Sequence, residues 1–255
     1  MLVRRYRGCI IIAGIMLLAT ATGCGGQQHA APSPRAVNAT EANELANVRF
    51  LNLTSGGARL VAQLDEGGGQ LAITGWVDWK KELLYAEFHP PGQTDPARTG
   101  LLQCTPGGLG IRAATLTTAP PVPVPTDGWN YRAYSSTATV DLMCQMLLRL
   151  NSDRPDNASL LQQSGAYWLS QQRLGSATVD VIQGPGAAGQ PTPAPGQGTI
   201  RYWIDTQSGK LLRLQAKLGA TTAFSTFDFT YDTVPPISVL PPLQPPPSPS
   251  PSPSP

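Results

Sequence analysis

The chain has 255 residues, of which 13% are charged and 41% are hydrophobic, and its formal net charge is only +2. Binding to nucleic acid needs clustered cations that contact phosphates, and the basic residues here are scattered, so we expect no nucleic-acid partner. The low content of charged residues is offset by small and neutral ones, namely Gly, Pro, Ala, Thr and Gln. This composition is typical of an exported protein with a largely neutral surface.

The first two dozen residues have the order of a bacterial export signal. Three arginines lie among the first seven residues, an uncharged apolar run covers residues 9–19, and small residues then lead to Cys24. The apolar run is about a dozen residues long, whereas a transmembrane helix needs roughly 20. A cleaved signal is therefore favoured over a membrane span.

This segment resembles the signal and lipobox of bacterial lipoproteins, with Ala21 in place of the usual Leu. The resemblance implies that residues 1–23 are a signal peptide and that Cys24, once it is the first residue, carries acyl chains such as palmitate. Two or three chains, at about 0.8 kcal/mol per buried methylene, would anchor the protein at the outer face of the cell membrane. Ordinary secretion and a retained signal anchor are the alternatives.

Residues 24–37 are rich in small residues and proline, and we interpret them as a flexible tether. A helix is predicted next, over residues 39–54, because apolar residues recur there at helical intervals. Asn38 and Glu41 have the spacing of a capping box at its start, and Gly56-Gly57 supplies a stop.

The hydrophobic period then changes to two, which indicates strands over residues 58–65, 71–79, 83–88, 99–105 and 109–113. Short turns separate these strands, so we expect an antiparallel meander. The second strand carries Trp76 on one face and apolar residues at alternating positions on the other: Leu71, Ile73, Val77 and Trp79.

The middle of the chain breaks this pattern. Residues 140–150 are too apolar for a helix that faces water, so the segment is buried on most sides or covers an apolar surface. A short helix is predicted around residues 159–164. The predicted class is α+β, with one antiparallel sheet of about ten strands, an N-terminal helix and one or two central helices. The later strands lie over residues 166–173, 178–183, 200–206, 211–218 and 223–231.

Residues 234–255 turn to proline and finish in Ser-Pro repeats. Proline without partners favours a solvated polyproline II rod, so we expect a disordered tail, with a wall-penetrating spacer or a site of sugar attachment as alternatives. Residues 38–233 remain as one domain, which we expect to be a monomer.

Cys104 and Cys144 remain as a pair if Cys9 leaves with the signal and Cys24 is acylated. In an oxidising compartment they can form a disulfide that closes a loop of about 40 residues, contributing on the order of 3 to 4 kcal/mol. Two separate buried thiols are the alternative.

Two blocks of sequence resemble the LolA-like carriers, which include the mycobacterial lipoproteins that carry lipoglycans. One is residues 75–79, Gly-Trp-Val-Asp-Trp, with the returning strand 85–88. The other is residues 201–214, in which Trp-Ile-Asp precedes a glycine turn and Leu-Leu-Arg-Leu follows it, with the closing strand 227–231. The resemblance implies a curved, half-open barrel whose concave face is covered by helices above a lipid-binding cavity.

Several predicted strands are apolar or aromatic on both faces, so both faces of the sheet need cover. The helices can fill the concave side completely, or they can leave a gap lined by aliphatic and aromatic side chains. In the second case a lipid or glycolipid is bound by apolar burial beneath helices that act as a lid. The candidate contacts, placed by element, are Trp76, Trp79, Phe88, Met143, Leu147, Trp168, Tyr202, Trp203 and Phe227.

No set of catalytic residues is evident in the sequence. The two histidines are His29 in the tether and His89 in a His-Pro-Pro-Gly turn, so a His-based triad or zinc site has at most one imidazole within the domain. Residues 98–100, Arg-Thr-Gly, imitate one motif of penicillin-interactive enzymes without its Ser-x-x-Lys partner. We therefore expect no enzyme, no cofactor and no metal site.

The alternative to a lipid-binding protein is an interaction module on the same fold, which senses or scaffolds a partner at the cell envelope. It predicts a filled concave face together with an exposed apolar patch.

Overall fold

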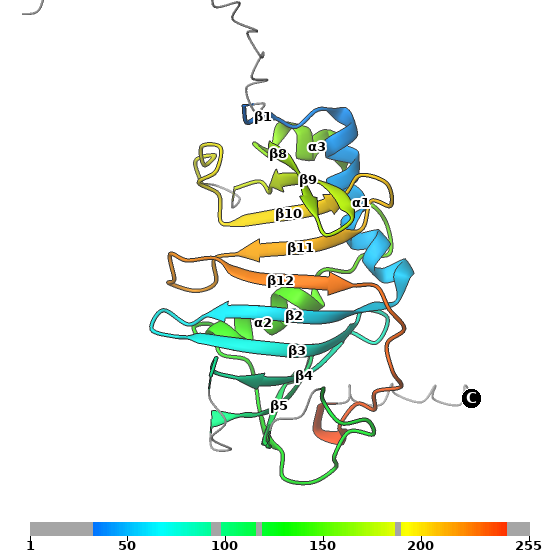
Figure 1. Cartoon of the computed structure of the whole chain (residues 1–255), viewed down its shortest axis with the longest axis vertical. Coiled ribbons are helices and arrows are strands. Elements are labelled where there is room, and N and C mark those ends of the chain that lie inside the picture. The colour runs from blue at the N-terminus through cyan, green and yellow to red at the C-terminus, as the bar shows by residue number, and fades with distance from the viewer. Residues whose placement is uncertain (1–32, 93–97, 116–118, 187–189, 244–255) are drawn as a thin grey trace, which may run out of the picture. The chain divides into compact units, whose positions relative to one another are not determined.

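The computed structural model describes residues 33–92, 98–115, 119–186 and 190–243 (Figure 1). Twelve strands form one antiparallel sheet in the order β1-β8-β9-β10-β11-β12-β2-β3-β4-β5-β6-β7. The strands are β1 (Arg35–Ala36), β2 (Gly57–Asp65), β3 (Gln70–Asp78), β4 (Leu83–His89), β5 (Gly100–Thr105), β6 (Gly108–Ala113), β7 (Asn130–Arg132), β8 (Tyr167–Leu174), β9 (Ala177–Gln183), β10 (Ile200–Asp205), β11 (Leu211–Ala216) and β12 (Ser225–Thr230). The helices are α1 (Ala39–Ser55), α2 (Thr139–Leu148), α3 (Ala158–Gln163) and the 3-10 turn η2 (Pro241–Leu243).

The predicted fold class is confirmed: the protein is α+β with a single, open, curved antiparallel sheet. The predicted strands correspond to β2–β6 and β8–β12, and the three predicted helical segments correspond to α1, α2 and α3. The strands β1 and β7 were not predicted. They have only two and three residues, which is too short for an alternating pattern to be recognised.

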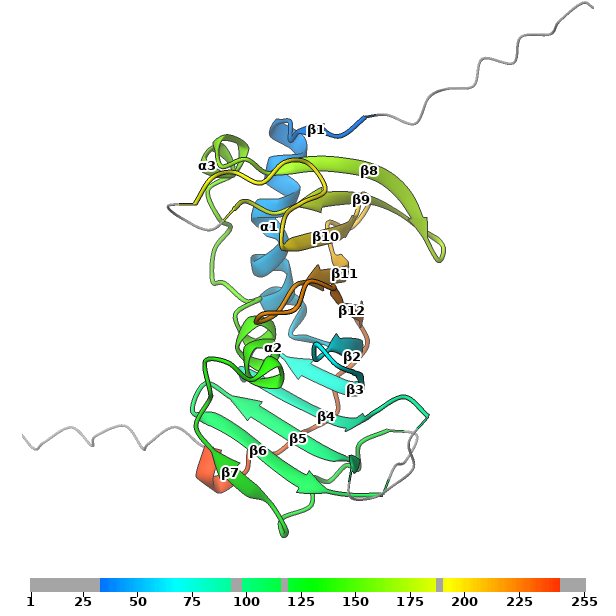
Figure 2. The ribbon, with the colours of Figure 1, turned by 90° about the vertical axis from the view of Figure 1, so that its left-hand side faces the viewer.

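The sheet curves around α1 and α2, which lie on the same face (Figure 2). We call this the inner face and the opposite one the outer face. The predicted capping box starts α1: the Asn38 side chain accepts a hydrogen bond from the Glu41 backbone N–H, and the Glu41 carboxylate accepts one from the Asn38 N–H. The main core fills the space between α1, α2 and the inner face, as the side chains of Leu45, Leu60, Ile73, Leu84 and Leu147 illustrate.

Part of the outer face is covered by the chain that follows β12. The sequence places residues 234–243 in a solvated tail, whereas in the structure they cross the outer face of β4 and β5. Ile237, Leu240 and Leu243 recur every three residues and are all buried, so this segment has apolar side chains to cover a sheet that is apolar on both sides. The Gln103 amide fixes the segment by donating to the Ser238 carbonyl (3.0 Å) and accepting from the Leu240 N–H (2.8 Å). Residues 244–255 lie outside the described residues.

The last residues of the predicted tether are also packed. Arg35 and Ala36 pair with the start of β8, and Val37 is buried. The Arg35 guanidinium donates to both carboxylate oxygens of Glu41 at 2.6 and 2.7 Å and lies 4.7 Å from the centroid of the Trp168 ring. The predicted signal peptide and the proposed acylation site Cys24 lie outside the described residues.

Glu44 lies one turn after Glu41 on α1, and its surroundings disfavour the ionised form of its side chain. Its Oε2 atom is buried and has no hydrogen-bond partner among the described residues. Burial, together with the charges of Asp180 and Glu41, raises the pKa of Glu44 to about 7. The folded protein therefore binds this proton more tightly than the unfolded chain, so the contribution of Glu44 to stability falls as the pH rises from about 4.5 to about 7.

We expect Glu44→Gln to raise the free energy of unfolding at pH 8 by on the order of 1 kcal/mol, because solvent still reaches part of the side chain, and to change it little at pH 4. Urea unfolding at the two pH values measures the difference. Glu66→Gln, in an exposed turn, is the control. An equal effect of Glu44→Gln at both pH values would show that its charge is not the cause.

Candidate functional site

A cleft of about 720 Å³ lies between the inner face of β3–β6 and the start of α2. Its volume is in the range of small-molecule binding sites. The floor is apolar and is formed by Leu71, Phe88, Leu102, Ile111 and Val140, whereas the rim carries Glu66, Arg98, Arg132, Thr137 and Thr139.

The floor follows from the alternation of the strands. Leu102 on β5 pairs with Ile111 on β6, and both side chains point to the inner face. Phe88 on β4 pairs with Gly100 on β5. A Cβ atom at Gly100 would lie 2.4 Å from the Arg112 carbonyl oxygen and 2.9 Å from the Phe88 ring, so glycine is needed for the ring to lie against this strand.

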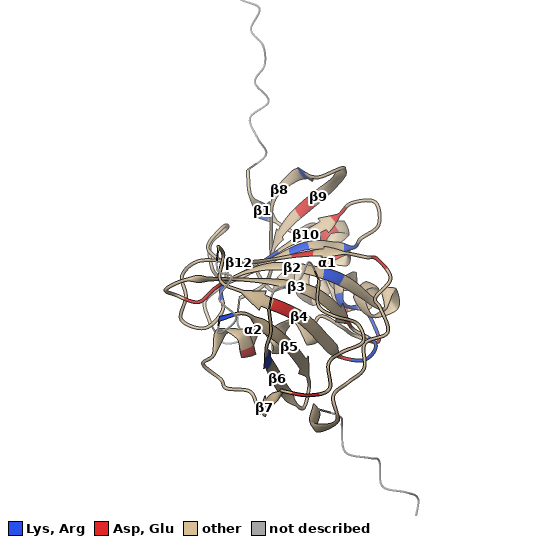
Figure 3. Ribbon diagram, turned by 60° about the horizontal axis from the view of Figure 1, so that its bottom comes forward, with Lys and Arg blue, Asp and Glu red and all other residues tan. Residues whose placement is uncertain are grey.

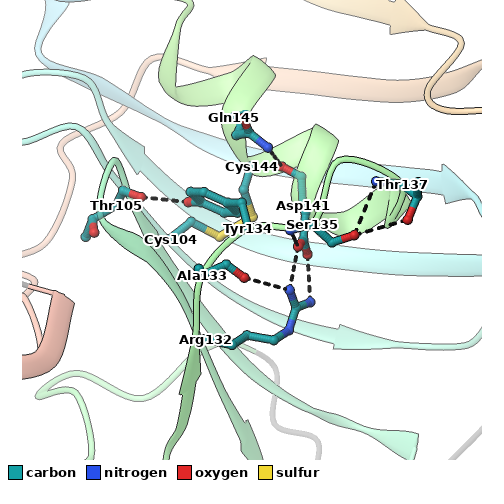
Figure 4. A network of polar contacts seen from close by, with 10 residues as sticks. All are labelled: Cys104, Thr105, Arg132, Ala133, Tyr134, Ser135, Thr137, Asp141, Cys144 and Gln145. Carbon is teal, nitrogen blue, oxygen red and sulfur yellow. Dashed lines mark hydrogen bonds and ion pairs between the residues drawn. A yellow bond between two sulfur atoms is a disulfide. The ribbon is translucent and has the colours of Figure 1, made fainter.

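The start of α2 is held by an ion pair between the exposed Arg132 side chain and the buried carboxylate of Asp141 (Figure 4). Both oxygens of the Asp141 carboxylate accept hydrogen bonds from the Arg132 guanidinium, and one of them also accepts from the Ser135 N–H at 2.6 Å. Burial alone would raise the pKa of Asp141, but the hydrogen bonds from Arg132 and Ser135 outweigh burial and lower it. Asp141 is therefore ionised at neutral pH and fixes the first turn of α2 to β7.

A disulfide between Cys104 on β5 and Cys144 on α2 holds the middle of the helix, with 6.0 Å between the two Cα atoms. Both cysteines are fully buried. The pairing expected from the cysteine count is thus present, and the alternative of two separate thiols is not observed. Nearby, the Tyr134 hydroxyl donates to the Thr105 carbonyl at 2.7 Å and ties the segment before α2 to the same strand.

We expect the double variant Cys104→Ala/Cys144→Ala to lose about 2–4 kcal/mol of unfolding free energy, because the bridge closes a long loop in the unfolded chain. Urea unfolding measures the loss. Adding a reductant should lower the stability of the native protein by a similar amount and leave the double variant unchanged. A double variant as stable as the oxidised native protein would contradict a structural role for the bridge.

The end of α2 is held by three donor side chains. The Arg49 guanidinium donates to the carbonyls of residues 149 and 151 at 3.1 and 2.9 Å. The Asn52 amide donates to the Leu150 carbonyl at 2.8 Å, and the Trp79 indole donates to the Leu147 carbonyl at 3.1 Å. The carbonyl groups at the end of a helix have no hydrogen-bond donors within the helix. These three side chains provide the missing donors and so fix this end of α2 as well.

The structure brings only one of the nine predicted contact residues, Phe88, into the cleft. Among the described residues, no hollow lies directly beneath the centre of α2. Four of the nine side chains belong to the main core and have no exposed surface: Trp79, Met143, Leu147 and Phe227. Trp168 and Tyr202 also pack into the main core. Trp76 and Trp203 belong to clusters on the outer face.

The remaining lining residues escaped prediction because no local pattern marks them. Leu102 and Ile111 look like ordinary strand residues. Arg132 acquires its role from Asp141, which lies in a different element. Val140 belongs to the floor because α2 is held against the sheet by contacts between distant residues, and the local sequence pattern does not reveal such contacts.

Within the described ranges, no group of three or more His, Cys, Asp and Glu side chains could hold a metal ion. None of the helices in the part of the chain that the structure describes has the length and apolar character needed to span a bilayer. In the part of the chain that the structure describes, Lys, Arg, Asp and Glu are distributed over several strands and loops (Figure 3).

The fold and the site together define an α+β protein with an open, curved antiparallel sheet and a cleft, apolar on its floor and polar at its rim, beside one of the covering helices. No sequence-family model and no curated protein matches the chain. Among solved structures, a crystal structure of MucB matches with a TM-score of 0.37 and 11% identity over 77% of this chain and 60% of the MucB chain. The MucA/MucB complex of Pseudomonas aeruginosa matches with a TM-score of 0.33 and 11% identity, over 76% of this chain and 56% of that chain.

A DUF1329 family protein from Desulfovibrio piger matches with a TM-score of 0.30 and 10% identity, over 75% of this chain and 91% of that chain. The chain spans about 60% of the length of the MucB chain. These values describe a partial likeness of fold.

Proposed function

We propose that this protein is a membrane-anchored, extracytoplasmic lipoprotein that binds a lipid or another amphipathic molecule without covalent chemistry. The division of the cleft into an apolar floor and a polar rim carries this proposal. An acyl chain on the floor would be stabilised by about 0.8 kcal/mol for each methylene removed from water, while the rim leaves a polar headgroup in contact with solvent and with hydrogen-bonding side chains. The sequence resemblance to LolA-like carriers points to the same function.

The proposed anchor is the acylated Cys24, which lies eleven residues before Arg35. A fully extended chain spans at most about 3.3–3.6 Å per residue, so β1 would stay within roughly 40 Å of the membrane surface. The docking of residues 35–37 on β8 and α1 shortens the free tether relative to the predicted span of residues 24–37. The folded domain would therefore remain close to the lipids that it binds.

Native mass spectrometry of the full-length protein, released from a mild detergent, tests the proposal. We expect a lipid-sized mass adduct that persists under native conditions, disappears on denaturation and increases when phospholipid or glycolipid is added. The acyl modification of Cys24 should survive denaturation, so the same spectra separate the anchor from the ligand. A protein that carries no adduct in any preparation and gains none with added lipid would refute lipid binding.

One observation favours the second candidate, an envelope interaction module. The packing beneath the centre of α2 is solid, since Met143, Cys144 and Leu147 have no exposed surface. The exposed apolar patch that this alternative also predicts is not evident: among the described residues the most exposed large apolar side chain is Leu160 on α3, at 63%, and the others lie in different parts of the fold. In this alternative the protein stays free of lipid in native spectra and recognises a partner protein instead.

A further inference from the structure

We infer that the cleft prefers single-chain amphiphiles with an anionic, acceptor-rich headgroup, and that Arg98 is the residue that sets this preference. The inference rests on the proposed binding of an amphiphile in this cleft. It goes beyond that proposal because it names the charge of the headgroup and the side chains that would recognise it.

The rim holds two guanidinium groups in different electrostatic states. The charge of Arg132 is matched by the buried carboxylate of Asp141. Arg98 is exposed, lines the cleft and has no ion-pair or hydrogen-bond partner among the described residues. Arginine presents five N–H donors in a planar fork that suits phosphate and carboxylate groups. Arg98 is therefore the cation that a headgroup at this rim would meet first.

Further donors lie at the start of α2. Ala138 occupies the N-cap position and offers no side-chain cap. No hydrogen bond among the described residues uses the backbone N–H groups of Thr139 and Val140, and both residues line the cleft. Together with Arg98, these groups make the rim richer in donors than in acceptors.

Glu66 is the rim residue that opposes this preference. It lies in the exposed turn between β2 and β3, without an ion-pair partner among the described residues. Its carboxylate would repel an anionic headgroup, and removing that charge should strengthen the preference. Removing the charge of Arg98 should therefore weaken the preference for an anionic headgroup, and removing the charge of Glu66 should strengthen it. A merely structural role for either residue would not produce effects of opposite sign.

The volume of the cleft limits the ligand to one chain. At about 720 Å³ it matches sites that enclose a single drug-sized molecule. We therefore expect a single-chain amphiphile to fit and a lipid with several long chains to leave part of its apolar surface outside.

A competition experiment tests the inference. The full-length protein is mixed with equal concentrations of palmitoyl-lysophosphatidylglycerol, which is anionic, and palmitoyl-lysophosphatidylcholine, which is zwitterionic and has the same chain. Native mass spectrometry then gives the ratio of the two adducts. We expect about a threefold to fivefold excess of the anionic lipid, the size expected for a partly exposed charge pair.

Arg98→Gln should bring the ratio close to one, and Arg98→Lys should restore most of the preference. Glu66→Gln should raise the ratio. Arg59→Gln removes an exposed arginine from the outer face of β2 and should leave the ratio unchanged.

Each other outcome overturns the inference in a recognisable way. Equal binding of both lipids, or a ratio unaffected by Arg98→Gln, would overturn the headgroup preference and leave amphiphile binding intact. Binding of neither lipid would overturn this inference, and if the protein also carries no other lipid adduct in any preparation, the proposed function fails as well. Displacement of the anionic lipid by inorganic phosphate at equal concentration would indicate a site for free anions rather than for an amphiphile.

Discussion

Replacing Ile111 with tryptophan is expected to lower the affinity for palmitoyl-lysophosphatidylglycerol at least about tenfold, which corresponds to about 1.4 kcal/mol. Ile111 lies on β6 with its partly buried side chain on the floor of the cleft. The larger indole would occupy the space that the acyl chain needs, and tryptophan is well tolerated in strands. Titration of the lipid followed by native mass spectrometry measures the affinity.

Val61→Trp is the matched control, because Val61 lies on β2 with 43% of its surface exposed, on the outer face. This variant should bind the lipid as the native protein does. Urea unfolding should place the free energy of unfolding of both variants within about 1 kcal/mol of the native value. Unchanged affinity in a stable Ile111→Trp variant would contradict the placement of the ligand in this cleft.

Replacing Trp79 with alanine is expected to lower the free energy of unfolding by about 3–5 kcal/mol. The side chain is completely buried, and its ring lies 5.9 Å from the Phe229 ring and 6.0 Å from the Tyr231 ring between centroids. Its indole N–H also donates to the Leu147 carbonyl. The substitution therefore creates a cavity and removes one of the donors that hold the end of α2.

Trp79→Phe separates the two contributions. It keeps most of the apolar volume and removes the hydrogen bond, so we expect a smaller loss of about 1–2 kcal/mol. Urea unfolding of the two variants measures both losses. A Trp79→Ala variant as stable as Trp79→Phe would show that the space around Trp79 is not packed as the structure indicates.

Periodicity in the sequence was sufficient to predict most of the fold. The alternation through β3 and the residue that follows it assigns Ile73, Val77 and Trp79 to one face and Trp76 to the other, and the structure confirms this division. The capping box at Asn38 likewise marks the start of α1. Such signals are local, since each depends on residues only a few positions apart. The hydrophobic effect buries apolar side chains in the same way in most proteins, so the pattern can be interpreted without knowing the rest of the fold.

The site and the chain ends depend on contacts between distant residues. The cleft is open because α2 is held over β5 by Cys104–Cys144 and beside β7 by Arg132–Asp141. Composition alone predicts a free tail after residue 233, yet a few apolar residues among the prolines suffice to pack residues 234–243 on the sheet. Placing the ligand contacts by element selected mostly buried core residues instead, because the large apolar side chains of those elements fill the core here.

The central claim is that the cleft at the start of α2 holds the apolar part of a ligand. Photolabelling tests this claim most directly. The full-length protein is irradiated with palmitic acid that carries a diazirine near its methyl end, and the labelled residues are identified by peptide mass spectrometry. We expect labels on the floor residues Phe88, Leu102 and Val140, and their loss in the Ile111→Trp variant. Labels spread over the outer face, or equal labelling of the floor in Ile111→Trp, would contradict the claim.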